Sequence, residues 1–222
     1  MKRILIYALG FTALVSCTKT IAPQIQDKSR RGLIDNFYEM TSFSLDYSRN
    51  DNMLFVRKPD NTISGPEKET LRTKYGDTLY YPTAPAVKEG KFDSYANGFT
   101  AIAVTSGSEF NGIPAGESLG DKIRIVGLST YRYIKSRNEE FNPWTTIPED
   151  YASMCSEEDL CPENFPVNKS LSSLTKEDLA LLNVNNLALK FTESPGIKEQ
   201  KIKVTFYEGE KSCSAERTVL FE

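Results

Sequence analysis

The feature of this sequence that most constrains its fold is an alternation of apolar and polar residues near the C-terminus. In the stretch KIKVTFY, residues 201–207, the apolar residues Ile202, Val204 and Phe206 alternate with lysine and threonine. A β-strand points successive side chains to opposite faces, so a period of two puts all three apolar side chains on one face. The pattern predicts a strand that buries one face against a core.

A matching last strand is predicted at RTVLF, residues 217–221. The intervening EGEKSCSAE contains Gly209, and we interpret the two strands as a hairpin whose loop is longer than two residues. Alternation, or enrichment in branched and aromatic residues, predicts further strands at residues 43–47, 52–57, 99–105 and 122–134.

One helix is predicted in this strand-rich chain, beginning near Ser173. Thr175 is suited to cap the free amides, and Glu177 and Asp178 stand favourably at the positive end of the helix dipole. The apolar stripe is Leu179, Leu181 and Leu182, and the end falls at Asn183 or Asn185. Because strands dominate, we expect a mainly β fold: an antiparallel β-sandwich-like domain with one short inserted helix.

The N-terminus has the organisation of a secretory signal peptide. A basic start is followed at Ile4 to Ser16 by 13 residues without a charge, whereas a transmembrane helix needs roughly 20. Leu14-Val15-Ser16-Cys17 resembles a bacterial lipobox, which implies thioether attachment of a diacylglyceryl group to Cys17 and cleavage after Ser16. We expect residues 1–16 to be a signal peptide and Cys17 to be a lipid anchor; the alternative is an ordinary signal peptide that contains a cysteine.

Residues 17–32 are predicted to be the lipidated cysteine and a tether, because they lack regular hydrophobic periodicity. Residues 33–222 would then form a single β-rich domain that the acyl chains hold to a membrane. Surface-exported lipoproteins of Bacteroidetes tend to carry an acidic run after the lipidated cysteine, whereas this chain has Thr18-Lys19-Thr20. By that resemblance we expect a cell-envelope protein, anchored in the outer membrane and facing the periplasm.

Composition argues against several classes of function. Loss of Lys2 and Arg3 with the signal peptide would leave 25 basic and 30 acidic residues, a formal charge of −5, with no basic stripe for nucleic acid. The chain has no histidine, which removes Ser-His-Asp and Cys-His catalysis and histidine-ligated metal sites. We expect no cofactor, no metal and no catalytic residues. The alternative is a carboxylate-dependent glycan-processing enzyme, with two acids about 5–10 Å apart.

A family resemblance rests on VTSGSEFNGIPAGESL, Val104 to Leu119. With the NEEF stretch at Asn138 to Phe141 and the C-terminal hairpin at 201–222, it resembles a group of uncharacterised Bacteroidetes lipoproteins of about 200 residues. That family is a domain of unknown function, so the resemblance implies an envelope lipoprotein and carries over no site residues. The physical interpretation of NGIPAGESL is a loop in which Pro114 and Gly116 set a turn.

Three cysteines remain if Cys17 is lipidated. The periplasm is oxidising, so Cys155 and Cys161 are a candidate disulfide closing the small SEEDL loop. A pair that includes Cys213, or no disulfide at all, are the alternatives.

The stretch EEFNPWTTIPEDY sets Phe141, Trp144 and Tyr151 beside carboxylates and prolines. Sugar sites often combine an aromatic face with hydrogen bonds from acids and amides, so these residues are a candidate ligand platform. The alternative is that Phe141 and Trp144 close one end of the core. The acidic residues 157–159 do not have EF-hand spacing and are interpreted as a solvated loop. The function expected is a non-enzymatic binding or scaffolding domain, with an envelope protein or a glycan as partner.

Overall fold

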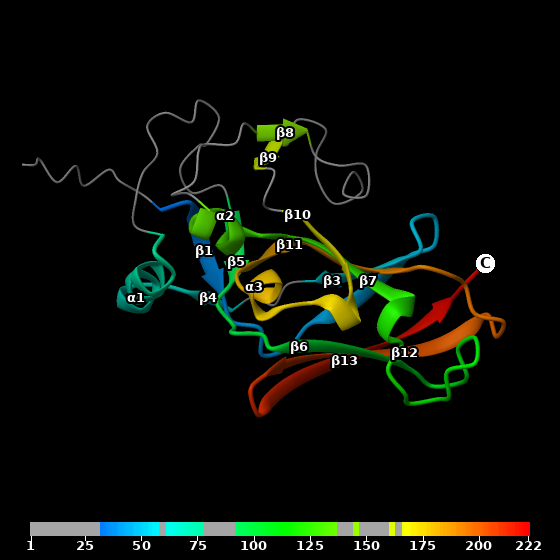
Figure 1. Cartoon of the computed structure of the whole chain (residues 1–222). Coiled ribbons are helices and arrows are strands. Elements are labelled where there is room, and N and C mark those ends of the chain that lie inside the picture. The colour runs from blue at the N-terminus through cyan, green and yellow to red at the C-terminus, as the bar shows by residue number, and fades with distance from the viewer. Residues whose placement is uncertain (1–31, 58–60, 78–91, 137–143, 147–159, 163–165) are drawn as a thin grey trace, which may run out of the picture.

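The protein is described from a computed structural model, which describes residues 32–57, 61–77, 92–136, 144–146, 160–162 and 166–222 (Figure 1). The structure is mainly β, with 50% of residues in strands and 17% helical. The fold class expected from the sequence is therefore confirmed.

The strands are β1 (Ile34–Tyr38), β2 (Ser44–Ser48), β3 (Met53–Arg57), β4 (Thr62–Ile63), β5 (Phe92–Tyr95), β6 (Ala101–Ser106), β7 (Ile123–Ser129), β8 (Trp144–Thr146), β9 (Leu160–Pro162), β10 (Pro166–Ser170), β11 (Leu182–Phe191), β12 (Glu199–Glu208) and β13 (Lys211–Leu220). The α-helices are α1 (Pro66–Tyr75), α2 (Thr130–Ser136) and α3 (Lys176–Leu179). Short 3-10 turns lie at Gly120–Lys122 and Leu171–Ser173.

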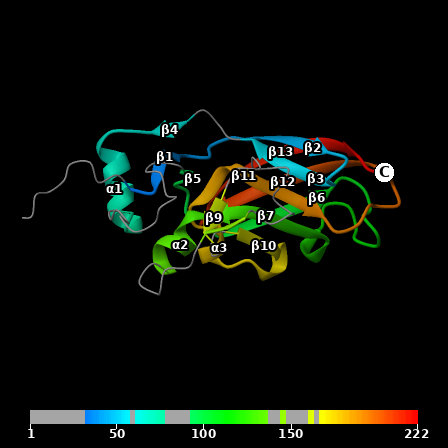
Figure 2. The same ribbon diagram turned by 90° about the horizontal axis from the view of Figure 1, so that it is seen from above.

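Two sheets form the body of the sandwich. The larger has eight strands in the order β10-β7-β11-β5-β1-β4, with β3 paired to β11 and β2 paired to β3. The smaller is β13-β12-β6, and it lies beneath the larger sheet in Figure 1, with a second view in Figure 2. A separate ladder joins β8 to β9.

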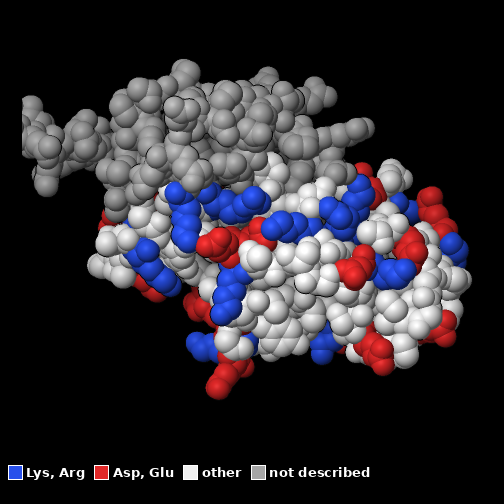
Figure 3. All heavy atoms as spheres, in the orientation of Figure 1, with Lys and Arg blue, Asp and Glu red and all other residues white. Residues whose placement is uncertain are grey.

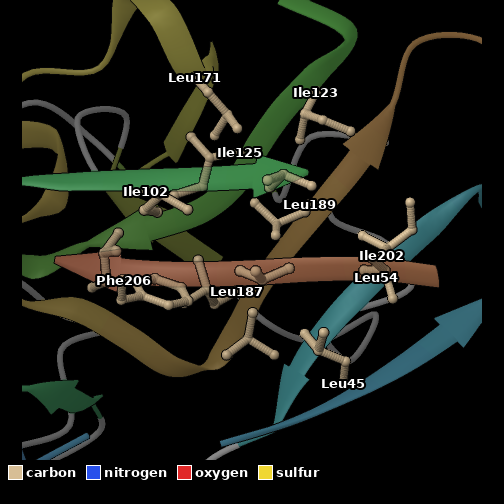
Figure 4. Packing of buried hydrophobic residues seen from close by; sticks show 14 of the residues in the cluster. Leu45, Leu54, Ile102, Ile123, Ile125, Leu171, Leu187, Leu189, Ile202 and Phe206 are labelled. Atoms are coloured by element: carbon tan, nitrogen blue, oxygen red, sulfur yellow. The ribbon is translucent and has the colours of Figure 1, made fainter. Parts of the chain in front are cut away.

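The main core lies between the two sheets. Figure 4 shows Ile102, Ile202 and Phe206 from the smaller sheet facing apolar side chains of the larger sheet, and all three are at most 7% exposed. The residues that meet them include Leu45, Leu54, Ile125, Leu187 and Leu189. The alternation in KIKVTFY is therefore the inner face of β12, as predicted.

A second apolar cluster lies on the other side of the large sheet. Val126 and Leu128 of β7 pack there with Phe37 and Phe92, and Leu71 of α1 packs against them. The large sheet is thus apolar on both faces. Because α1 contributes only partly buried side chains, it covers this cluster without entering it.

The C-terminal hairpin is tighter than predicted. Glu208 pairs directly with Lys211, so the loop is only Gly209 and Glu210. Gly209 has a φ of 61°, the left-handed conformation that such short turns require. The polar residues after the turn, including Cys213 opposite Phe206, belong to the edge strand β13 and not to a loop.

The predicted helix exists but is shorter than expected. Thr175 Oγ1 accepts the Asp178 amide at 3.3 Å while the Asp178 carboxylate accepts the Thr175 amide at 3.0 Å, a reciprocal capping box. The helix ends at Leu179 because Leu181 takes a φ of 49° and Leu182 begins β11. The predicted stripe therefore belongs to two different elements.

Two features differ from the expected antiparallel domain with one helix. Helices α1 and α2 were not predicted; the strand expected at 122–134 ends at Ser129, where α2 follows. The pair β1·β5 is parallel, with Tyr38 opposite Tyr95, so the large sheet is mixed.

The first described residues are fixed to the domain by one carboxylate. Asp77 accepts the amides of Leu33 at 2.7 Å and Ile34 at 3.1 Å, and both contacts are buried. A Cβ on Gly32 would lie only 2.3 Å from Asp77 Oδ2, so this approach requires glycine. Within the described part of the chain, no helix is both long and apolar enough to cross a membrane.

Candidate functional site

A pocket of about 410 Å³ opens where the tip of the β12–β13 hairpin meets the chain that follows β1 and the chain that follows β5. Its floor is apolar and buried, and comprises Met40, Phe99 and Phe206. The remaining lining residues are polar: Glu39, Thr41, Asn97, Glu208, Lys211, Ser212 and Cys213. A volume of this size is in the range of small-ligand sites.

Asn97 holds the three segments of the pocket together. Its Oδ1 accepts the Met40 amide at 2.7 Å, and its Nδ2 donates to Glu208 Oε2 at 3.0 Å. The adjacent Gly98 amide donates to Glu208 Oε1 at 3.0 Å. Asn97 is only 6% exposed and its bond to the Met40 amide is buried, so Asn97 is held in place, and its bond and that of Gly98 fix the direction of the Glu208 carboxylate.

Glu208 is held in its ionised form. Burial raises the pKa of the Glu208 carboxyl, but the hydrogen bonds from Asn97 and Gly98 outweigh that effect and leave the pKa below its ordinary value. The positive charges of Lys211 and Lys74 lower the pKa further. The pocket therefore contains one negative charge that is fixed in position.

Cys213 lines the pocket as a neutral thiol. Burial and the Glu208 charge both raise the pKa of its half-buried side chain. Behind it lies the wholly buried Tyr95, whose hydroxyl has no hydrogen-bond partner among the described residues. Burial, and then proximity to Cys213, raise the pKa of Tyr95, so both groups stay protonated at neutral pH.

The aromatic floor is closely packed, with tilted and edge-to-face ring contacts, and offers little open ring surface. The Phe99 and Phe206 ring centroids are 5.0 Å apart, Tyr95 approaches Phe99 at 6.0 Å, and Phe43 approaches Phe206 at 5.2 Å. Phe99 is 3% exposed and Phe206 1%. The floor can contact an apolar group, but it lacks the flat, open face on which a sugar ring stacks.

The opposite end of β12 is closed by Gln200, which is fully buried. Gln200 Nε2 donates to the carbonyls of Glu109 at 3.0 Å and Ile197 at 3.1 Å, and its Oε1 accepts the Ser108 hydroxyl at 2.6 Å. These bonds fasten two loops whose exposed tips lie at the C-terminal end of the molecule in Figure 1. Every polar atom of the Gln200 side chain has a partner within the protein.

The motif Val104 to Leu119 supplies one of these two loops. Phe110 is its buried anchor, and Asn111, with a φ of 47°, accepts the Gly196 amide through Oδ1 at 3.1 Å. Gly116 has a φ of 81°, and the Glu117 amide donates to the Pro114 carbonyl at 3.2 Å. The predicted turn is confirmed.

Charged side chains elsewhere pair with one another. Figure 3 shows lysine and arginine mixed with acidic side chains over the described surface of one face. The buried Asp178 carboxylate accepts a hydrogen bond from Lys169 Nζ at 2.7 Å and lies 3.7 Å from the Arg132 guanidinium. Burial raises the pKa of Asp178, but its hydrogen bonds with Lys169 and Thr175 outweigh that effect and leave the pKa below its ordinary value. This group stabilises α3 against β10 and does not line the Glu208 pocket.

Of the candidate site residues singled out in the sequence, only Cys213 lines this pocket, and most of the others lie outside the described residues. Cys17, Phe141, Tyr151 and Cys155 are outside them, as are residues 157–159. The β8–β9 ladder pairs Trp144 with Pro162 and Thr145 with Cys161. Cys213 carries no disulfide. No group of three potential metal ligands gathers in the part of the chain that the structure describes.

Sequence reasoning missed the pocket because its lining comes from three segments that are distant in the sequence, residues 39–41, 97–99 and 206–213. A usable signal was the pair Glu208 and Lys211 flanking a Gly-containing turn, which predicts charged groups at a hairpin tip.

Comparisons with protein-family models, with curated proteins and with solved structures find no match for this chain.

Proposed function

We propose that this protein is a lipid-anchored bacterial envelope lipoprotein whose β-sandwich domain binds a ligand, without catalysis, in the Glu208 pocket. The observation that carries the binding role is the arrangement of Asn97 and Gly98, which hold an ionised carboxylate over an apolar floor. Such a preorganised charge beside an apolar surface is the usual composition of a small-ligand site.

The anchor is supported by the Leu14 to Cys17 motif and by the length of chain before the domain. Fourteen residues lie between Cys17 and Gly32, and an extended chain of that length reaches about 50 Å. The resemblance to Bacteroidetes lipoproteins agrees with a placement on the outer membrane, facing the periplasm.

Binding is favoured over carboxylate catalysis by the direction of the pKa shifts. A glycosidase needs a general acid whose pKa is raised. Glu208 is shifted downward, as are the other described carboxyls with a resolved shift: Asp46, Asp178, Glu193 and Glu216. Glu208 is thus suited to attract a positive charge or accept a hydrogen bond, and unsuited to donate a proton.

Glycan binding is the second candidate function, and the carboxylates and the amide around this pocket favour it. Hydroxyl groups of a sugar are recognised by such acceptors. The tightly packed floor weakens this candidate relative to a ligand with an apolar stem.

The anchor is tested by labelling cells that express the full chain with an alkyne fatty acid and fractionating them without detergent. The wild-type protein is expected to carry the label and to sediment with membranes. The Cys17→Ala variant is expected to lose both properties. A Cys17→Ala protein that still carries the label would overturn the assignment.

The binding role is tested by alkylating Cys213, which lines the pocket. Saturation-transfer NMR is recorded with a set of alkyl amines, alcohols, carboxylates and neutral oligosaccharides. At least one of these compounds is expected to bind, and to stop binding after alkylation. The Cys213→Ser protein, treated identically, should keep the signal. If alkylation of Cys213 abolishes the binding of none of these compounds, the pocket is not the binding site.

A further inference from the structure

The two carboxylates of the pocket, Glu39 and Glu208, are hydrogen-bond acceptors. Each oxygen of the Glu208 carboxylate accepts one bond, from Asn97 or Gly98, and retains a second acceptor position. The carbonyl oxygen of Asn97 is already used by the Met40 amide. An exposed second carboxylate, Glu39, stands among the lining residues. A ligand that complements these two carboxylates must bring hydrogen-bond donors.

The charges of the lining residues also favour a ligand that carries hydrogen-bond donors over an anionic one. Glu39 and Glu208 contribute two negative charges, and Lys211 contributes one positive charge on an exposed side chain. Glu208 is fixed by two hydrogen bonds, whereas no ion pair or hydrogen bond of the Lys211 side chain to a described residue is found. The charge with a set position is therefore negative, and an anionic ligand would face two carboxylates.

The floor determines what must carry the positive charge. Met40, Phe99 and Phe206 give the pocket an apolar base, and Cys213 beside them is uncharged. A strongly hydrated inorganic cation gains nothing from such a surface and would meet too few oxygen ligands. An aliphatic stem gains about 0.8 kcal/mol for each methylene that it buries.

We propose that the pocket binds a primary alkylammonium group, with the ammonium between Glu208 and Glu39 and the aliphatic stem on the Met40–Phe99–Phe206 floor. This inference rests on the proposed binding function and names its ligand class. The lysine side chain has the same chemistry, so an exposed lysine of an envelope protein is the natural form of such a ligand. The ammonium donates hydrogen bonds to the two free acceptor positions of Glu208. A neutral alcohol can also donate a hydrogen bond there, but it brings no positive charge to the carboxylate.

The test is an NMR titration of the folded protein with n-hexylamine hydrochloride, 1-hexanol and sodium hexanoate at pH 7, followed at the amides of residues 39–41 and 97–98. Hexylamine is expected to bind at least tenfold more tightly than hexanol, and hexanoate more weakly than either. Raising the salt concentration from 50 to 300 mM should weaken hexylamine binding and leave hexanol binding unchanged, because only a charged ligand is screened.

Matched variants locate the charge recognition. Glu208→Gln should weaken hexylamine binding at least tenfold and leave hexanol binding within twofold, which also shows that the pocket is intact. Glu39→Gln, at an exposed position that cannot disturb the fold, should weaken hexylamine binding about threefold. Glu210→Gln, at the tip of the same hairpin and outside the lining, should change neither.

Two results would overturn the inference. If hexanol or an oligosaccharide binds as tightly as hexylamine, or if Glu208→Gln leaves the preference for the amine unchanged, the ammonium assignment is wrong although the pocket is still a binding site. If none of the three probes shifts residues 39–41 and 97–98, and Cys213 alkylation also blocks no ligand, the proposed binding function is wrong as well.

Discussion

Strand β12 carries a polar side chain near each of its ends, and the two side chains differ in charge, burial and hydrogen bonding. At one end Gln200 is neutral, fully buried and saturated with hydrogen bonds from two loops. At the other end Glu208 is charged, half-buried and only partly saturated, and it faces a pocket of about 410 Å³. A saturated neutral group stabilises a structure, whereas a fixed charge with free acceptor positions can still bind something. This difference supports our proposal of a structural role for the Gln200 end and a binding role for the Glu208 end.

The largest effect on stability is expected at the Gln200 end. Gln200→Ala removes a fully buried side chain and leaves the carbonyls of Glu109 and Ile197 and the Ser108 hydroxyl without their partner, so it should lower the free energy of unfolding by about 3 kcal/mol. Urea denaturation followed by circular dichroism measures this. Ligand binding by the folded fraction should be unchanged; loss of hexylamine binding would break the separation of the two ends.

A smaller loss of stability is expected at Asn97, because this residue serves both structure and binding. Asn97→Ala removes the bonds to the Met40 amide and to Glu208, and should cost about 2 kcal/mol of unfolding free energy. It should also weaken hexylamine binding, since Glu208 loses one of its two positioning contacts. A variant as stable as the wild type, measured by the same urea titration, would show that Asn97 does not join the segments.

Glu208 should contribute to stability in a pH-dependent way. Its folded pKa is lowered, so its contribution is fully present above the unfolded pKa, about 4.3, and is lost as the pH falls through the folded pKa. At pH 7, Glu208→Gln should be about 1 kcal/mol less stable than wild type. The difference should shrink as the pH falls through the folded pKa of Glu208, and a difference that grows on acidification would mean that the shift has the opposite sign.

The smallest effects on stability are expected at the exposed carboxylates of the hairpin end. Glu39→Gln and Glu210→Gln should each change the free energy of unfolding by less than about 0.5 kcal/mol, since neither side chain is buried. Only Glu39→Gln should weaken hexylamine binding. Equal loss of binding in both variants would indicate long-range attraction by net charge and not a localised site.

Local patterns predicted the sandwich well where one face of a strand is buried. The alternation at 201–207 and the branched residues at 99–105 lie in β12 and β6, and the Thr175 cap starts α3. The edge strand β13 was mistaken for a loop around Cys213 because its outward face is polar and its inward face carries a half-buried cysteine. An edge strand with one solvated face gives a weaker hydrophobic signal than a central one.

The other errors come from interactions that are distant in sequence. Helix α1 has no fully buried residue, so its sequence shows no apolar stripe that would have predicted it. Gly65-Pro66, followed by two glutamates, is a helix-start signal that the sequence did offer. The parallel pair β1·β5 joins strands more than fifty residues apart, which no local period reveals. The pocket depends in the same way on Asn97 reaching both Met40 and Glu208.

The most direct test of the difference between the two ends is a complete map of amide shifts at saturating hexylamine. We expect the largest shifts at residues 39–41, 97–98 and 211–213, which line or adjoin the Glu208 pocket, and negligible shifts at 107–117 and 196–200. Shifts centred on the Gln200 loops, or spread evenly over both ends of β12, would contradict the assignment of binding to the Glu208 end.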